Sequence, residues 1–176
     1  MGLDERVMLS DDQRSQLRIL TECVIDNLTA AKSNGQVVFI TNAEQGWIEL
    51  SCQKFMPELE PIVKNTRIIS ARSVYEPQGV LAPFQWKHLA FEREILGFLQ
   101  ESSMETRKNI ISIGDSPHER QALINVSELL SGCCVKALKL VEKPSLDLLL
   151  KEHEVLRGSM FHDIIHHDGC LDIDMS

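Results

Sequence analysis

The chain lacks long hydrophobic runs and paired cysteines, and both absences limit the class of protein. Its 176 residues contain no stretch close to the roughly 18 consecutive apolar residues of a membrane-spanning helix. The acidic start, MGLDERVMLSDDQ, has no apolar centre of the kind found in secretory signals. The cysteines, at positions 23, 52, 133, 134 and 170, are odd in number and irregular in spacing, without a CxxC pair. A disulfide framework or a zinc site is therefore not expected, and we predict a cytoplasmic protein with reduced thiols.

Basic residues are also scarce. The chain has 18 Lys and Arg against 26 Asp and Glu, which gives a net charge of −8 and a pI near 5.2. This balance argues against nucleic acid or an anionic membrane as the main partner. The proportions of hydrophobic residues (43%) and charged residues (25%) are those of ordinary globular proteins, and the length suits one domain. We expect that domain to span residues 1–165, followed by a flexible tail over residues 166–176.

What is present is an alternation of helical and strand-like segments. Ser10 and Gln13 form a capping-box pattern at the start of a helix that should end at Asn34, with Gly35 in the left-handed conformation. Short apolar runs indicate strands at 37–41, 67–71, 109–114 and 134–141, and the run at 37–41 is expected to be buried on both faces. Further helices are expected at 43–59, from 83 onward, at 118–130 and at 145–165, with a loop at 73–83. This order predicts an α/β fold in which a three-layer, Rossmann-like parallel sheet carries helices on both faces.

Several polar residues follow the predicted strands. Thr41 and Asp115 each come at the end of an apolar strand, and Lys87 lies in the first turn of a predicted helix. Because functional groups gather at the carboxyl ends of parallel strands, the hydroxyl, the ammonium and the carboxylate could meet there around one phosphate. A carboxylate in that position is also a suitable ligand for Mg²⁺. Glu119, in the same stretch as Asp115, is a second candidate acid.

The order of these residues resembles motifs II, III and IV of the haloacid dehalogenase (HAD) superfamily. The resemblance places motif II at Thr41, motif III at Lys87, and motif IV at Asp115 with Glu119. The blocks TNAEQGWIELSCQKFMP, RIISARSVYEP, WKHLAF and GDSPHER are also similar to a narrower HAD-like group of microbial eukaryotes. The resemblance extends over nearly the whole chain, from about residue 10 to about residue 160.

The resemblance implies a Mg²⁺-dependent phosphatase that transfers a phosphoryl group first to an aspartate and then to water. The family's nucleophile is the first Asp of a DxDx(T/V) motif on the first strand, and this sequence contains no such motif. Asp11 and Asp12 are better explained as acids in the first turn of a helix. We therefore expect a HAD-like core without the family's first strand or its nucleophile, which makes it a catalytically incomplete fragment or pseudoenzyme. The implied cofactor is Mg²⁺ held by Asp115 and Glu119, and the implied ligand is phosphorylated.

Two other interpretations stay open. In one, the chain belongs to an active phosphatase whose motif I lies upstream of residue 1. In the other, it is a non-catalytic interaction module on a flavodoxin-like fold, in which Asp115 only caps a helix. Each of the other site residues also has a structural explanation: Thr41 closes a strand, Lys87 is a solvated helix-start lysine, and Glu119 is a favourable first-turn acid. A missing first strand would expose a sheet edge, which predicts oligomerisation.

Two further groups of residues have a functional and a structural explanation. Arg72, which follows the strand at 67–71, is either a phosphate ligand or a surface arginine. The C-terminal stretch FHDIIHHDGCLDIDMS places His162 and His166 four residues apart, a spacing that puts both imidazoles on one helical face. The HExxH pattern of zinc sites is absent there, so an ordinary flexible tail is the simpler expectation.

Overall fold

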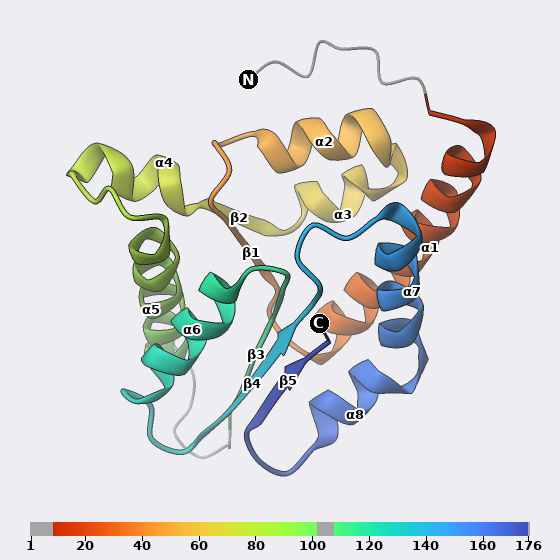
Figure 1. The fold of residues 1–176 in the computed structure, drawn as a ribbon. Coiled ribbons are helices and arrows are strands. Elements are labelled where there is room, and N and C mark those ends of the chain that lie inside the picture. The colour runs from red at the N-terminus through yellow and green to blue at the C-terminus, as the bar shows by residue number, and fades with distance from the viewer. Residues whose placement is uncertain (1–8, 102–107, 176) are drawn as a thin grey trace.

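The structure is a computed structural model that describes residues 9–101 and 108–175 (Figure 1). Its helices are α1 (Asp11–Asn34), α2 (Trp47–Phe55), α3 (Glu60–Lys64), α4 (Ala71–Tyr75), α5 (Pro83–Glu101), α6 (Pro117–Ser127), α7 (Leu146–Val155) and α8 (Phe161–His166). Its strands are β1 (Val38–Thr41), β2 (Arg67–Ser70), β3 (Lys108–Gly114), β4 (Cys133–Lys139) and β5 (Leu171–Asp174). Short 3₁₀ turns lie at Pro57–Leu59 and Glu76–Gln78, and a π-helical turn at Leu156–Met160 joins α7 to α8. None of the described helices is long and apolar enough to cross a membrane.

The described strands form two small parallel sheets. β1 pairs with β2, with Thr41 opposite Ser70, and β4 lies between β3 and β5, with Gly114 opposite Lys139. A mixed α/β fold with parallel strands is therefore confirmed, whereas the single continuous sheet expected from the sequence is not what these strands form. The physical reason is that no strand in the described part of the chain pairs with the second edge of β1 or of β3.

One pair of helices packs on both sheets. Phe91 and Ile95 of α5 form a buried cluster with Leu123 of α6, and Ile40 of β1 and Ile110 of β3 both pack against this cluster. The two sheets are therefore held together by a shared α5–α6 layer and not by a backbone ladder. On the other side, α7 packs against α1, and the turn after α7, together with α8, covers the larger sheet (Figure 1).

Burial of the strands follows their place in the sheets. Residues 134–139 of β4, the central strand of the larger sheet, are buried, whereas every residue of β1 is only partly buried. Ile113 of β3 is 39% exposed. The apolar run at 37–41 is expected from the sequence to be buried on both faces, and for β1 this expectation is wrong. β1 and β3 each have an unpaired edge among the described residues.

The ends of the helices follow local sequence signals. The capping box at the start of α1 is confirmed: Gln13 N donates to Ser10 Oγ (3.2 Å) and Ser10 N donates to Gln13 Oε1 (2.9 Å). α1 ends at Asn34 as predicted, but Gly35 is extended (φ 172°), not left-handed. Gly46 is left-handed (φ 86°), so α2 begins only after it and is shorter than the predicted helix at 43–59. The predicted loop at 73–83 contains the end of α4 instead, because the Ser70 hydroxyl caps that helix.

The C-terminal residues belong to the larger sheet. The sequence predicts a flexible tail over 166–176, whereas the structure places 171–174 in β5, parallel to β4. The strand alternates, with Leu171 and Ile173 packed against the cluster that contains Leu138, and the two aspartates exposed. This alternation is typical of a strand with one buried face, and it gives the last residues a place in the fold.

Candidate functional site

Lys87 lies at the centre of the candidate site. It belongs to the first turns of α5, is buried, and donates a hydrogen bond from Nζ to the backbone oxygen of Ile40 in β1 (2.6 Å). Its Nζ also lies 2.7 Å from Oε1 of Glu119 in α6. Asn42 Nδ2 donates to Pro83 O (3.0 Å), which ties the start of α5 to the end of β1. The interpretation of Lys87 as a solvated helix-start lysine is therefore wrong.

Glu119 lies against the end of β3. A Cβ atom added to Gly114 would be 2.9 Å from Glu119 Cγ, so the carboxylate side chain occupies the space that the glycine leaves open. One oxygen of Glu119 is paired with Lys87, while Oε2 is buried and has no hydrogen-bond partner among the described residues. Glu119 thus contacts both the lysine from α5 and the end of β3, where Asp115 follows. Its role as a first-turn acid does not account for these contacts.

Thr41 ends β1 and Asp115 follows the end of β3, and each is next in sequence to a residue that the ion pair contacts. Thr41 Oγ1 accepts a hydrogen bond from Ala43 N (3.0 Å), which shapes the turn after β1. Asp115 is exposed, and no described residue forms a salt bridge or side-chain hydrogen bond with it. The N-cap of α6 is Ser116, whose hydroxyl accepts from His118 N (3.1 Å). The helix-cap interpretation of Asp115 is therefore wrong, and its carboxylate stays available to a ligand.

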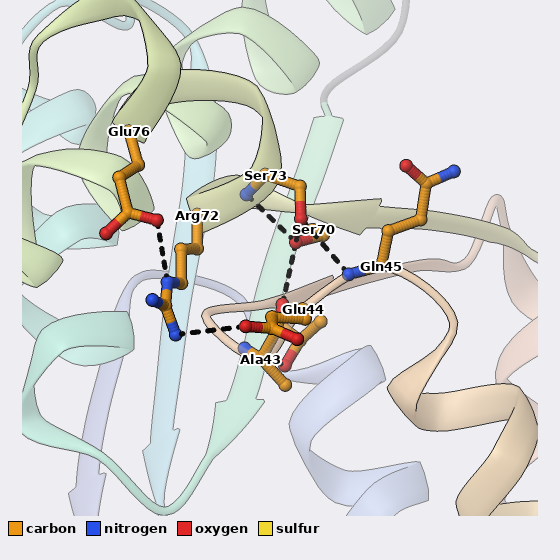
Figure 2. A network of polar contacts seen from close by, with 8 residues as sticks. Ala43, Glu44, Gln45, Ser70, Arg72, Ser73 and Glu76 are labelled. Atoms are coloured by element: carbon orange, nitrogen blue, oxygen red, sulfur yellow. Dashed lines mark hydrogen bonds and ion pairs between the residues drawn. The ribbon is translucent and has the colours of Figure 1, made fainter. Parts of the chain in front are cut away.

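Arg72 belongs to a separate polar network that joins the ends of β1 and β2 (Figure 2). Its Nε donates to Glu76 Oε2 (2.9 Å), and its NH1 lies 3.7 Å from Glu44 Oε1. In the same network, Ser70 Oγ donates to Ala43 O (2.6 Å) and lies 2.8 Å from Ser73 Oγ. These contacts support the interpretation of Arg72 as a surface arginine. Neither Ser70 nor Ser73 is among the predicted site residues, although a serine at the end of a strand with a second serine three residues on is a capping signal.

A cavity of about 280 Å³ lies beside the site, along β2. Thr41 and Ser70 are among its lining residues, together with the ion pair between Arg67 and Glu94 (2.9 Å). Lys87, Asp115 and Glu119 do not line it. The cavity therefore reaches one of the predicted site residues and is separate from the lysine and the two carboxylates.

The two acids offer few ligands to a metal. Within residues 9–101 and 108–175, no group of three or more His, Cys, Asp or Glu side chains is placed to hold a metal ion. Mg²⁺ is commonly bound through only one or two carboxylates, with water and phosphate oxygens as its other ligands. The buried, unpartnered Oε2 of Glu119 and the exposed carboxylate of Asp115 fit that limited demand.

Comparison with known proteins adds no relative. The sequence matches no family model, and no curated protein or solved structure matches it. The resemblance to the HAD superfamily therefore rests on the quoted motifs. The structure adds the placement of their residues: Lys87 touches Glu119 and the residue before Thr41, and Glu119 packs against the residue before Asp115.

Proposed function

We propose that this chain is a HAD-like domain that binds a phosphorylated ligand without hydrolysing it. The observation that carries the proposal is the position of Lys87, whose ammonium meets Ile40 O of β1 and Glu119 of α6. Thr41, Lys87 and the pair Asp115 and Glu119 come from three separate stretches of the sequence, yet contacts link the segments that hold them. Such a cluster of a hydroxyl, an ammonium and two acids suits a phosphate better than an uncharged ligand.

The ammonium has one donor left for a ligand. A lysine carries three N–H donors, and those of Lys87 have two described acceptors, Ile40 O and Glu119 Oε1. The hydroxyl of Thr41 uses its oxygen as an acceptor for Ala43 N, which leaves its proton for an incoming oxygen. Both groups can therefore donate to a phosphate without breaking the contacts that they already make.

The two acids are the metal ligands in this proposal. Asp115 and Glu119 would hold Mg²⁺, which would offset the charge of a bound phosphate. Hydrolysis is not proposed, because the only carboxylate that contacts Lys87 in the described residues is Glu119, and Glu119 is paired with that lysine. A nucleophile needs a carboxylate that is free to attack phosphorus, and the sequence has no DxDx(T/V) motif to supply it.

Thermal unfolding with inorganic phosphate, in the presence and absence of Mg²⁺, tests the proposal. A ligand at about a hundred times its Kd stabilises a fold by about 2.7 kcal/mol, which is a Tm rise of roughly 5–10 °C for a chain of this size. We expect Lys87→Met to abolish the rise and Lys64→Met, at an exposed lysine, to keep it. Asp115→Asn should remove only the part of the Tm rise that depends on Mg²⁺. Glu128→Gln, at the other end of α6, should keep the whole rise. A rise of equal size in Lys87→Met would refute the assignment.

A second candidate is an active phosphatase whose nucleophile-bearing strand comes from sequence outside this chain. Among the described residues, β1 and β3 each have an unpaired edge under the α5–α6 layer, and this favours the second candidate, because one further parallel strand between them would join the two sheets into the three-layer sheet expected from the sequence. Sequencing the 5′ end of the transcript would show whether DxDx(T/V) precedes residue 1. If it does, release of phosphate from an aryl phosphate by the longer chain, and none by its Asp→Asn variant, would replace the first proposal.

A further inference from the structure

Two histidines on α8 form a close, tilted ring pair, far along the chain from the proposed phosphate site. His162 and His166 are one helical turn apart, and their ring centroids are separated by 4.0 Å with an angle of 33° between the planes. Both side chains are exposed to solvent. Imidazoles at this separation on one helical face can reach a single ion placed between their ring nitrogens.

A hydrogen bond selects the protonation of one ring. His166 Nδ1 lies 2.9 Å from the backbone oxygen of His162. A carbonyl oxygen can only accept, so Nδ1 carries the proton and donates it, and the lone pair of the neutral ring lies on Nε2. Histidine ligands of metals commonly donate their other nitrogen to a carbonyl in this way, which fixes the orientation of the ring. His166 therefore already has the tautomer that a metal requires.

Hydrogen bonds from the larger sheet fix the backbone of the last turn of α8. Lys136 of β4 is buried, and its Nζ donates to the backbone oxygens of Ile164 (2.6 Å), Ile165 (3.0 Å) and His167 (2.9 Å). The side chain of Ile164 is also buried in the cluster between α8 and the larger sheet. The helix therefore presents both imidazoles from a fixed backbone, so binding an ion costs little ordering of the main chain.

We propose that His162 and His166 form a two-nitrogen site for a late first-row divalent ion, namely Cu²⁺, Ni²⁺ or Zn²⁺. Imidazole nitrogens suit these ions, whereas Mg²⁺ and Ca²⁺ prefer oxygen ligands, so the site is chemically distinct from the acids at Asp115 and Glu119. Water completes the coordination, because no third His, Cys, Asp or Glu side chain of the described residues joins the pair. The site should bind Cu²⁺ more tightly than either Ni²⁺ or Zn²⁺.

Calorimetric titration of the untagged full chain with Ni²⁺ and with Cu²⁺, at about pH 8 where imidazoles are generally neutral, tests the site. We expect one ion per chain, and an affinity that falls about tenfold or more in either His162→Gln or His166→Gln. His167→Gln is the matched control, because His167 is exposed and adjacent to His166 but lies outside the ring pair. Its affinity should equal that of the wild type.

The spectrum of bound Cu²⁺ supplies a second readout that does not depend on stability. Electron paramagnetic resonance should show coupling to two nitrogens in the wild type and to one in each of the two variants. Equal affinity in the wild type, His162→Gln and His166→Gln would overturn the proposal. So would a loss of binding in His167→Gln as large as in the other two.

Discussion

Replacing Lys87 with Met should destabilise the chain far more than the same change at Lys64, although both lysines make ion pairs of equal length. Lys87 Nζ lies 2.7 Å from Glu119 Oε1, and Lys64 Nζ lies 2.7 Å from Glu60 Oε1. The side chains of the first pair are 4% and 16% exposed, and those of the second are 67% and 39% exposed. Burial is therefore the main difference between the two pairs.

The magnitude follows from what each change leaves behind. Lys87→Met keeps most of the side-chain volume but leaves Glu119 without its countercharge and Ile40 O without its donor. A lost hydrogen bond to a charged group costs about 1.5–3 kcal/mol, and removing one partner of a buried ion pair costs about 3–5 kcal/mol. Because Glu119 keeps some contact with water, we expect about 3–4 kcal/mol for Lys87→Met. Lys64→Met should cost about 0–1 kcal/mol, as exposed pairs do.

Urea unfolding followed by circular dichroism measures both costs. Glu119→Gln and the double variant with Lys87→Met complete a cycle, whose coupling energy should be about 1–3 kcal/mol for groups in direct contact. The reasoning fails if Lys87→Met costs no more than Lys64→Met. It also fails if the coupling energy is within about 0.5 kcal/mol of zero, the range found for independent sites.

Three further predictions concern the ends of the strands and helices. Gly114→Ala should lower the free energy of unfolding by about 1–3 kcal/mol, because its Cβ would lie 2.9 Å from Glu119 Cγ. Gly97→Ala, in open space within α5, should instead raise the free energy of unfolding by about 0.5–1 kcal/mol in the same urea assay. Lys136→Met should lower the free energy of unfolding by about 2–4 kcal/mol, because three carbonyl oxygens at the end of α8 lose a charged donor; α8 should also lose protection in hydrogen exchange. Burial lowers the pKa of His153 below its ordinary value of 6.5. As the pH falls, His153 is therefore protonated in the unfolded chain before it is protonated in the folded chain, and the free energy of unfolding decreases below about pH 6.5. In His153→Gln the urea midpoint should fall less between about pH 7.5 and about pH 5.5, and an equal fall would contradict the assignment.

The elements of the fold could be predicted where a local signal was sufficient. The capping box at Ser10 and the apolar runs of β1, β3 and β4 placed these elements within one or two residues of their observed bounds. β5 was missed, because a run of four alternating residues beside a histidine-rich stretch is a weak signal until β4 is there to pair with it. The division into two sheets could not be read locally either, since it depends on which strand edges find a partner.

The candidate site was predicted as a set of residues and not as a set of contacts. Strand ends identified Thr41 and Asp115, and a helix start identified Lys87, but the direct pairing of Lys87 with Glu119 joins residues 32 positions apart on two helices. That contact depends on how α5 packs against α6, which no local pattern determines. The cap of α6 illustrates the opposite error, because Asp115 and Ser116 are both good cap residues and only the backbone geometry selects the serine.

The ammonium of Lys87 contributes both to the stability of the fold and to the proposed binding of phosphate. The link between the two depends on whether Glu119 stays paired with this ammonium. If a phosphate takes the third donor of Lys87, the ion pair persists, and Glu119→Gln lowers stability with little effect on the phosphate affinity measured without Mg²⁺. If the phosphate must displace Glu119, the same variant lowers stability and raises phosphate affinity, because a neutral amide competes less well than a carboxylate. An aspartate on a further strand between β1 and β3 would also need this lysine, so displacement is the behaviour that the second candidate function requires. The effect of Glu119→Gln on phosphate affinity therefore distinguishes two cases. Little change indicates a domain that binds phosphate with its ion pair intact. A rise in affinity indicates a lysine that Glu119 holds in place of another acid.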